Sequence, residues 1–211
     1  MKFYNQNSRN ISGKQSNPSN NWDNLMYPNP RKKRGILNNQ NKSNKSNITA
    51  ITGNWIAAVG TIIDAIANTP SSRFTEQMLT DLSIIGNILE AGGSAIVSET
   101  EDALLDKVGG QISAIGNLAV VAGILSKNEQ SGQLLEKQGD LLQLVGVGIT
   151  IKTEGKLTLL QTIANTGLII QVIGIVIAVF ADTETKEGEV MNAVGAWIQA
   201  VGAVITALAS D

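Results

Sequence analysis

The sequence predicts an all-α protein of about six long, glycine-rich, antiparallel helices in an up-and-down bundle or array, behind a disordered basic tail. Three observations predict this fold class. A glycine is followed by another glycine seven residues later six times, a capping residue is followed by glutamate five times between these pairs, and mostly apolar residues fill the intervening segments. The twelve repeat glycines are Gly53, Gly60, Gly86, Gly93, Gly116, Gly123, Gly139, Gly146, Gly167, Gly174, Gly195 and Gly202.

Residues 1–47 differ in composition from the rest of the chain, and we predict that they form a disordered tail. They are rich in Asn, Ser, Gln and Lys and show no apolar period, so they bury too little surface to offset the entropy lost on ordering. Residues 1–48 hold nine basic side chains against one acidic one, a net charge of +8, while residues 49–211 carry −10. Lys2 and Arg9 are followed by no apolar segment like that of a secretory signal peptide. Such a tail predicts attraction to a polyanion or to the acidic helical domain itself.

The helical domain, residues 48–211, begins with an expected helix over 48–68, which carries the repeat GNWIAAVG and ends before Pro70. Each later helix is expected to start at a Thr or Asn whose side chain accepts hydrogen bonds from the first N–H groups, followed by a Glu that complements the helix dipole. These caps are Thr75-Glu76, Thr100-Glu101, Asn128-Glu129, Thr153-Glu154 and Thr183-Glu184.

The cap spacings predict helices of roughly 22–26 residues, or about 33–39 Å. Links of two or three residues force neighbouring helices to run antiparallel. The fourth helix ends in a β-branched stretch with an extra glycine, Gly148, where we expect fraying or a kink. The sixth carries GAWIQAVG, nearly a copy of the first repeat. The later expected helices cover 76–98, 101–126, 129–151, 154–181 and 184–209.

Within each repeat, the first glycine defines position a of a heptad, and positions b and e share one narrow, mostly polar face. Positions c, d, f and g are mostly apolar, which predicts burial around most of each helix. Trp55 and Trp197 both occupy position c and are expected in the core. Glycine inside a helix costs about 1 kcal/mol relative to alanine, so we predict that the glycines let helices pack closely.

The distribution of charge along the chain is compatible with two environments, water and a membrane. Uncharged runs of 19, 25 and 21 residues cover 108–126, 157–181 and 190–210, and a membrane-spanning helix needs about 20 apolar residues. The helix over 76–98 carries Asp81 and Glu90 and would not span alone. The loops show no clean Lys/Arg alternation and Tyr and Trp form no interfacial belt. A soluble or conditionally membrane-associated bundle and a constitutively inserted one both fit these features.

The composition argues against an enzyme. The chain holds no cysteine and no histidine, which removes thiolate chemistry and the commonest general base and metal ligand. We find no phosphate-binding loop, nucleotide fingerprint, nucleophile elbow or calcium loop, and expect no catalytic residue, metal or cofactor. The densest charge is Arg31, Lys32, Lys33 and Arg34, which is either a solvated cluster or a site for a membrane or another anionic polymer. Nucleic acid is not expected as a partner, and the sequence leaves self-association open.

Repeated GNxLxxxG helices joined by Thr-Glu turns, behind an Asn/Lys-rich leader, resemble uncharacterised glycine-rich repetitive helical proteins of spore-forming Gram-positive bacteria. This resemblance covers residues 48–211, brings no assigned activity, and implies a bacterial membrane or a spore or cell envelope. We therefore predict a non-enzymatic structural or assembly protein associated with a membrane or envelope. The alternative is a membrane-inserting, pore-forming or bacteriocin-like protein.

Overall fold

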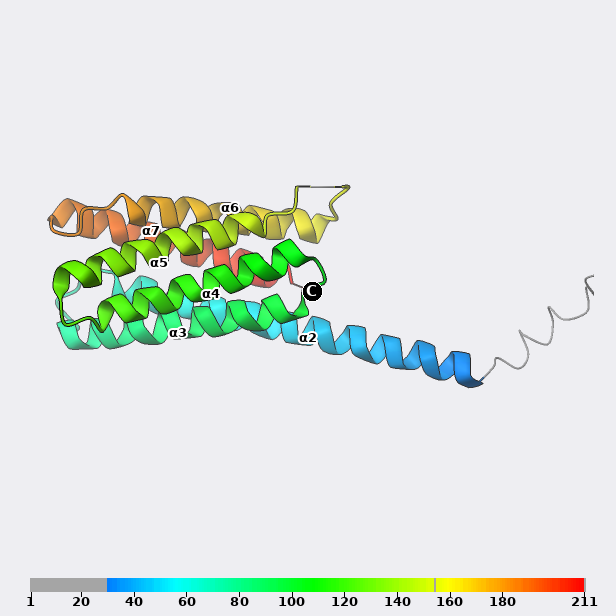
Figure 1. The fold of residues 1–211 in the computed structure, drawn as a ribbon. Coiled ribbons are helices and arrows are strands. Elements are labelled where there is room, and N and C mark those ends of the chain that lie inside the picture. Colours follow the sequence, from blue (N-terminus) through cyan, green and yellow to red (C-terminus); the bar gives the residue numbers. More distant parts are fainter. Residues whose placement is uncertain (1–29, 154, 211) are drawn as a thin grey trace, which may run out of the picture. The chain divides into compact units, whose positions relative to one another are not determined.

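The structure, a computed structural model, describes residues 30–153 and 155–210, with the backbone alone for 30–39 and 42, and these residues form helices joined by turns. These residues form no strand, which confirms the predicted all-α class. The helices are α2 (Pro30–Ala67), α3 (Glu76–Thr100), α4 (Leu104–Ile124), α5 (Glu129–Ile149), α6 (Leu159–Val179) and α7 (Lys186–Leu208) (Figure 1).

The first helix begins earlier than the sequence predicted. It starts at Pro30 rather than near residue 48, so the expected boundary between tail and helical domain lies inside α2. Proline suits the first turn of a helix, and the Lys, Arg and Gln that follow are good helix formers. The rest of the expected tail, residues 1–29, lies outside the described residues. The chain divides into two compact units, Met1–Lys42 and Ser43–Asp211, and the second contains α3 to α7 and the part of α2 that follows Lys42.

Two of the predicted caps are confirmed. The side chains of Thr75 and Asn128 accept hydrogen bonds from the N–H groups of Met78 and Ser131. Thr100 was wrong as a cap, because it is the last residue of α3, where its hydroxyl donates to the carbonyl of Val97, and Ala103 takes the cap position of α4.

The last two helices also start later than predicted. Thr158 caps α6 in a capping box with Gln161, and Thr185 caps α7. Gly155, with a φ of +78°, takes a left-handed conformation that helices do not continue through. The link between α5 and α6 is therefore longer than the sequence suggested.

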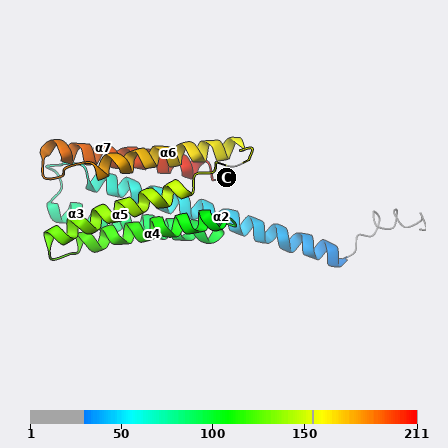
Figure 2. The ribbon, with the colours of Figure 1, turned by 45° about the horizontal axis from the view of Figure 1, so that its top comes forward.

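Consecutive helices of the second unit lie side by side, and the last closes against the first (Figure 2). The most extensive contacts join α4 to α5 and α6 to α7, while α3 packs on α4 and α5 on α6. Glycines join α2 to α3. Between α2 and α7 the contact consists of alanines: Ala58 with Ala203 and Ala207, and Ala65 with Ala196 and Ala200. The six helices thus form a closed ring.

The ring has two ends. What we call the Pro70 end carries the turns 68–75, 125–128 and 180–185, and the Lys152 end carries the turns 101–103 and 150–158. The first residues of the second unit, from Ser43 on, lie at the Lys152 end.

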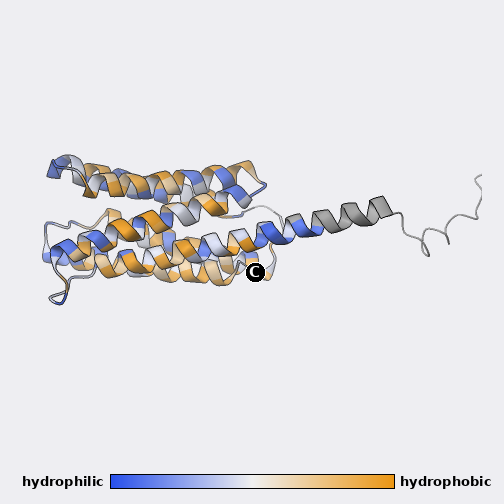
Figure 3. Cartoon of the chain, turned by 90° about the horizontal axis from the view of Figure 1, so that it is seen from below, coloured by the Kyte–Doolittle hydropathy of each residue, from blue (hydrophilic) through white to orange (hydrophobic). Residues whose placement is uncertain are grey.

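The apolar side chains lie on the outside of this ring, which contradicts the expected burial around most of each helix. All six c positions are large and apolar and are 41–53% exposed. They are Trp55, Ile88, Leu118, Leu141, Ile169 and Trp197. The expected core position of the two tryptophans was therefore wrong. Figure 3 shows hydrophobic residues along the middles of the helices. The period of the pattern is helical, but a period alone does not say which face meets the neighbours.

Candidate functional site

Glycines form the contacts within three helix pairs: α2 with α3, α4 with α5, and α6 with α7. A Cβ on Gly139 would lie 2.6 Å from the carbonyl oxygen of Gly116, and one on Gly93 would lie 2.5 Å from that of Gly53. Real Cβ atoms do not approach a backbone oxygen so closely, so only glycine fits at these contacts. We call the three lines of close contact between paired helices the glycine seams. All twelve repeat glycines lie in them, opposed as Gly53 and Gly93, Gly60 and Gly86, Gly116 and Gly139, Gly123 and Gly132, Gly109 and Gly146, Gly167 and Gly202, and Gly174 and Gly195.

These seams fix which face of each helix points inward. Because position a meets the partner helix, the polar b and e face turns to the interior and the apolar c and g positions turn out. A Cβ on Gly92, which occupies position g, or on Gly148 would meet no atom within 4 Å, so these two glycines belong to no seam.

The interior holds two cavities. One, of about 190 Å³, lies toward the Lys152 end, and the other, of about 460 Å³, lies toward the Pro70 end. All six helices contribute to the lining of each. Among the described residues, three line both cavities: Glu90 of α3, Gln143 of α5 and Gln199 of α7. A continuous path through the ring would have to pass between these three side chains, which we call the constriction.

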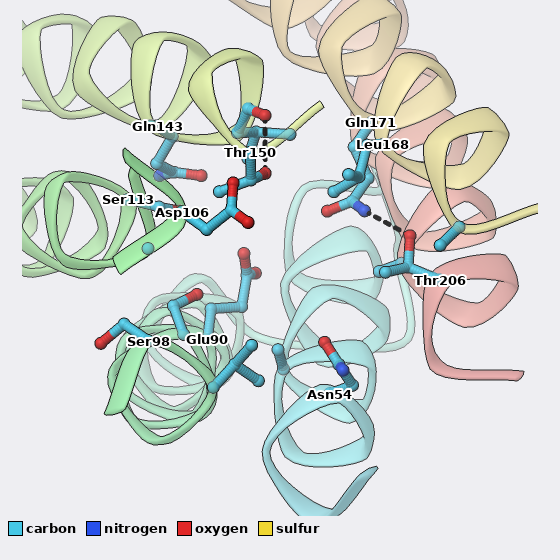
Figure 4. A pocket seen from close by; sticks show the side chains of 18 of the residues that line it. Asn54, Glu90, Ser98, Asp106, Ser113, Gln143, Thr150, Leu168, Gln171 and Thr206 are labelled. Atoms are coloured by element: carbon cyan, nitrogen blue, oxygen red, sulfur yellow. Dashed lines mark hydrogen bonds between the residues drawn. The ribbon is translucent and has the colours of Figure 1, made fainter. Parts of the chain in front are cut away.

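The constriction is polar and weakly bonded. The Gln199 amide nitrogen donates to Oε2 of Glu90 and to Oε1 of Gln143, with both distances 3.4 Å. Glu90 and Gln143 are each only 5% exposed. Figure 4 shows both side chains directed into the space between the helices. All three residues occupy position e of their repeats, so the polar stripe seen in the sequence is the inner wall of the ring.

The cavity toward the Pro70 end is rich in carboxyl groups. Asp64 is fixed there by three donors: the Ser83 hydroxyl at 2.7 Å and the Asn87 and Asn68 amides at 2.9 Å each. Lys137 is the basic residue in the lining of this cavity. The acidic residues in its lining are Asp64, Glu90, Glu136, Asp140, Asp182 and Glu184.

A pair of ion contacts lies in the other cavity, at the Lys152 end. The Lys152 ammonium lies 3.8 Å from Oε2 of Glu101 and 3.7 Å from Oδ2 of Asp106. The Asn165 side chain accepts from the backbone N–H of Lys152 at 3.1 Å and donates to its carbonyl at 2.6 Å, which ties the turn 150–158 to α6. Burial raises the pKa of the Glu101 carboxyl, and Lys152 opposes this rise.

Sequence reasoning missed several interior residues, although a signal for them exists. Asp64 follows Gly60 by four residues, and Glu136 follows Gly132 by four. They therefore take position e of an adjoining heptad and face the same cavity. Extending each glycine row by one heptad would have found them. The predicted anionic-surface site consists of Arg31, Lys32, Lys33 and Arg34. These residues belong to α2, and the structure describes their backbone but not their side chains.

Among the described residues, no group of three or more Asp or Glu side chains is placed to hold a metal ion.

Four of the helices are long and apolar enough to cross a membrane. They are Ser43–Ala67 within α2, and α4, α6 and α7. The other two, α3 and α5, carry Glu90, Glu136 and Asp140, which line the cavities.

No curated protein and no solved structure matches the chain. One family model does, and it covers residues 48–207, a stretch that includes all three glycine seams and both cavities. Its description is "Family of unknown function (DUF6944)". Since the match extends over more than half of the sequence, the chain belongs to the DUF6944 family.

Proposed function

We propose that this chain is an integral membrane protein whose six helices surround a polar conduit. The observation that carries the proposal is the inverted distribution of side chains. Large apolar residues at every c position point outward, and carboxyl and amide groups line two cavities inside. In water, exposed apolar surface costs roughly 25 cal/mol per Å², and soluble monomers rarely expose large contiguous patches of it. In a bilayer the same surface meets hydrocarbon.

The contacts between helices support a membrane setting as well. Inside a bilayer, helices associate through close backbone packing at small residues. Glycine seams join three helix pairs here, and alanines join α2 to α7.

The carboxyl groups of α3 and α5 explain why these two helices are not apolar enough to span alone. Glu90 and Asp140 face the interior, so their neighbours α2, α4 and α6 cover them from lipid. Ionisable residues in membrane helices are costly and usually mark a path for ions or protons. Such residues inside a closed ring favour a conduit over a purely structural assembly.

Two measurements test the proposal together. The protein should stay in the membrane pellet after a carbonate wash, and purified protein in liposomes should conduct ions. Retention without conductance would favour a structural protein of the membrane or envelope, and release by carbonate would contradict membrane insertion.

A first prediction concerns the two outward tryptophans. Trp55 is 41% exposed and Trp197 is 43% exposed, so lipids brominated on their acyl chains should quench the fluorescence of both. The measurement needs Trp22→Phe as background, with Trp55→Phe or Trp197→Phe added to isolate one signal. Quenching by aqueous iodide but not by brominated lipid would mean that the outer face meets water.

A further inference from the structure

We propose that Glu90 is the charge-selecting residue of the conduit, and that the constriction passes monovalent cations and rejects anions. This inference rests on the proposed function and adds to it the class of solute and the residue that selects it.

The place of Glu90 in the ring is the first argument. It lines both cavities, and only Gln143 and Gln199 share this property. A solute crossing from one cavity to the other must therefore come within contact distance of its carboxyl group. Other carboxyl groups, such as Asp64 and Asp140, line one cavity alone.

The charge of the constriction is the second argument. Glu90 is the one acidic residue among its three members, and the other two are neutral amides. The ion pairs formed by the described residues involve Lys107 and Lys152 with other carboxyl groups, and none includes Glu90. When it is ionised, a carboxyl group without a basic partner at a narrow point attracts cations and raises the energy of anions.

The weak bonding of Gln199 is the third argument, because its amide bridges Glu90 and Gln143 between the two cavities. An N–H···O hydrogen bond is usually about 2.9–3.0 Å long, and both bonds of the Gln199 amide measure 3.4 Å. By comparison, the Gln171 amide donates to Thr206 at 3.1 Å. Rotation of the Gln199 side chain breaks two long bonds, and it is the movement by which the constriction would open.

The test compares wild-type protein with Glu90→Gln in liposomes that carry a KCl gradient. The reversal potential gives the ratio of K⁺ to Cl⁻ permeability. We expect a cation preference in the wild type that falls by about tenfold or more in Glu90→Gln, because one charge in a low-dielectric constriction dominates the local potential. Glu90→Asp, which keeps the charge, should retain the preference.

A matched control keeps this comparison specific. Glu99 is a carboxyl group at the Lys152 end, exposed and paired with Lys107 at 3.1 Å, so Glu99→Gln should leave the permeability ratio unchanged. Circular dichroism checks that each variant remains helical. Where Glu90→Gln fails to fold, Gln143→Glu provides the test, because a second carboxyl group at the constriction should raise the cation preference.

The outcomes separate the inference from the proposed function. An unchanged ratio in a folded Glu90→Gln, or in a folded Gln143→Glu, overturns the role of Glu90 while the conduit stands. Wild-type protein that conducts nothing overturns the conduit and this inference with it. A pH gradient without permeant salt, followed with an entrapped pH dye, distinguishes protons from K⁺ as the cation carried, and Glu90→Gln should reduce whichever flux is found.

Discussion

Two neighbouring glycines of α3 have opposite surroundings. A Cβ on Gly93 would lie 2.5 Å from the carbonyl oxygen of Gly53 and 2.5 Å from the backbone nitrogen of Ala57, whereas one on Gly92 would meet no atom within 4 Å. The sequence shows two identical residues, and only the arrangement of α2 beside α3 distinguishes them. This explains why a spacing of seven could identify the seam glycines but could not say what each one touches.

This difference yields a paired prediction. Gly93→Ala forces α2 and α3 apart at their backbones and should lower the free energy of unfolding by about 1–3 kcal/mol, the usual cost of overpacking. Gly92→Ala should raise it by up to about 1 kcal/mol, because alanine favours the helix and meets nothing. Thermal unfolding in detergent, followed by circular dichroism, measures both. Equal melting temperatures for the two variants would mean that the glycine seam is not a close contact.

At the scale of the element, the contact between α2 and α7 decides whether the helices close into a ring or remain an open row. Ala58 is fully buried against Ala203 and Ala207, while its neighbour Val59 points outward and is 46% exposed. Ala58→Leu should therefore open this seam and lower the melting temperature by several degrees, given about 2–4 °C per kcal/mol for a chain of this size. Val59→Leu adds volume at the adjacent position on the outer face, and this variant should have the melting temperature of the wild type.

The helices also show which features of the fold could be predicted from the sequence. Its repeats predicted all-α structure, and Thr75 and Asn128 cap helices as expected. Thr100 and Thr183 resemble those caps in sequence, but a cap also depends on where the preceding helix ends, and α3 runs on through Thr100. The inner and outer faces could not be assigned, because an apolar stripe pointing to lipid and one pointing to a protein core share the same period.

At the scale of the whole molecule, the ring assigns each link to one end, which allows the positive-inside rule to be applied. The loops taken in chain order show no clean alternation of basic residues, but the ends do differ. Lys45, Lys107, Lys152 and Lys156 lie at or near the Lys152 end, and five further basic residues closely precede Ser43 in the sequence: Arg31, Lys32, Lys33, Arg34 and Lys42. The Pro70 end has Arg73, Lys127 and Lys186 in or beside its turns. Since basic residues close to the spans favour the cytoplasmic side, we predict that the Lys152 end faces the cytoplasm.

The chain holds no cysteine, so single-cysteine variants can test this orientation without further changes. A membrane-impermeant maleimide should label Ser72→Cys, in a turn of the Pro70 end, on intact cells, and should label Asp102→Cys, in a turn of the Lys152 end, only after permeabilisation. Replacing Arg31, Lys32, Lys33 and Arg34 with Gln removes the densest positive charge and should produce a mixed orientation, in which both cysteines are partly labelled from outside. If the replacement leaves the labelling pattern unchanged, the cluster does not set orientation, and its role as a contact for an anionic surface would have to be tested by vesicle binding instead.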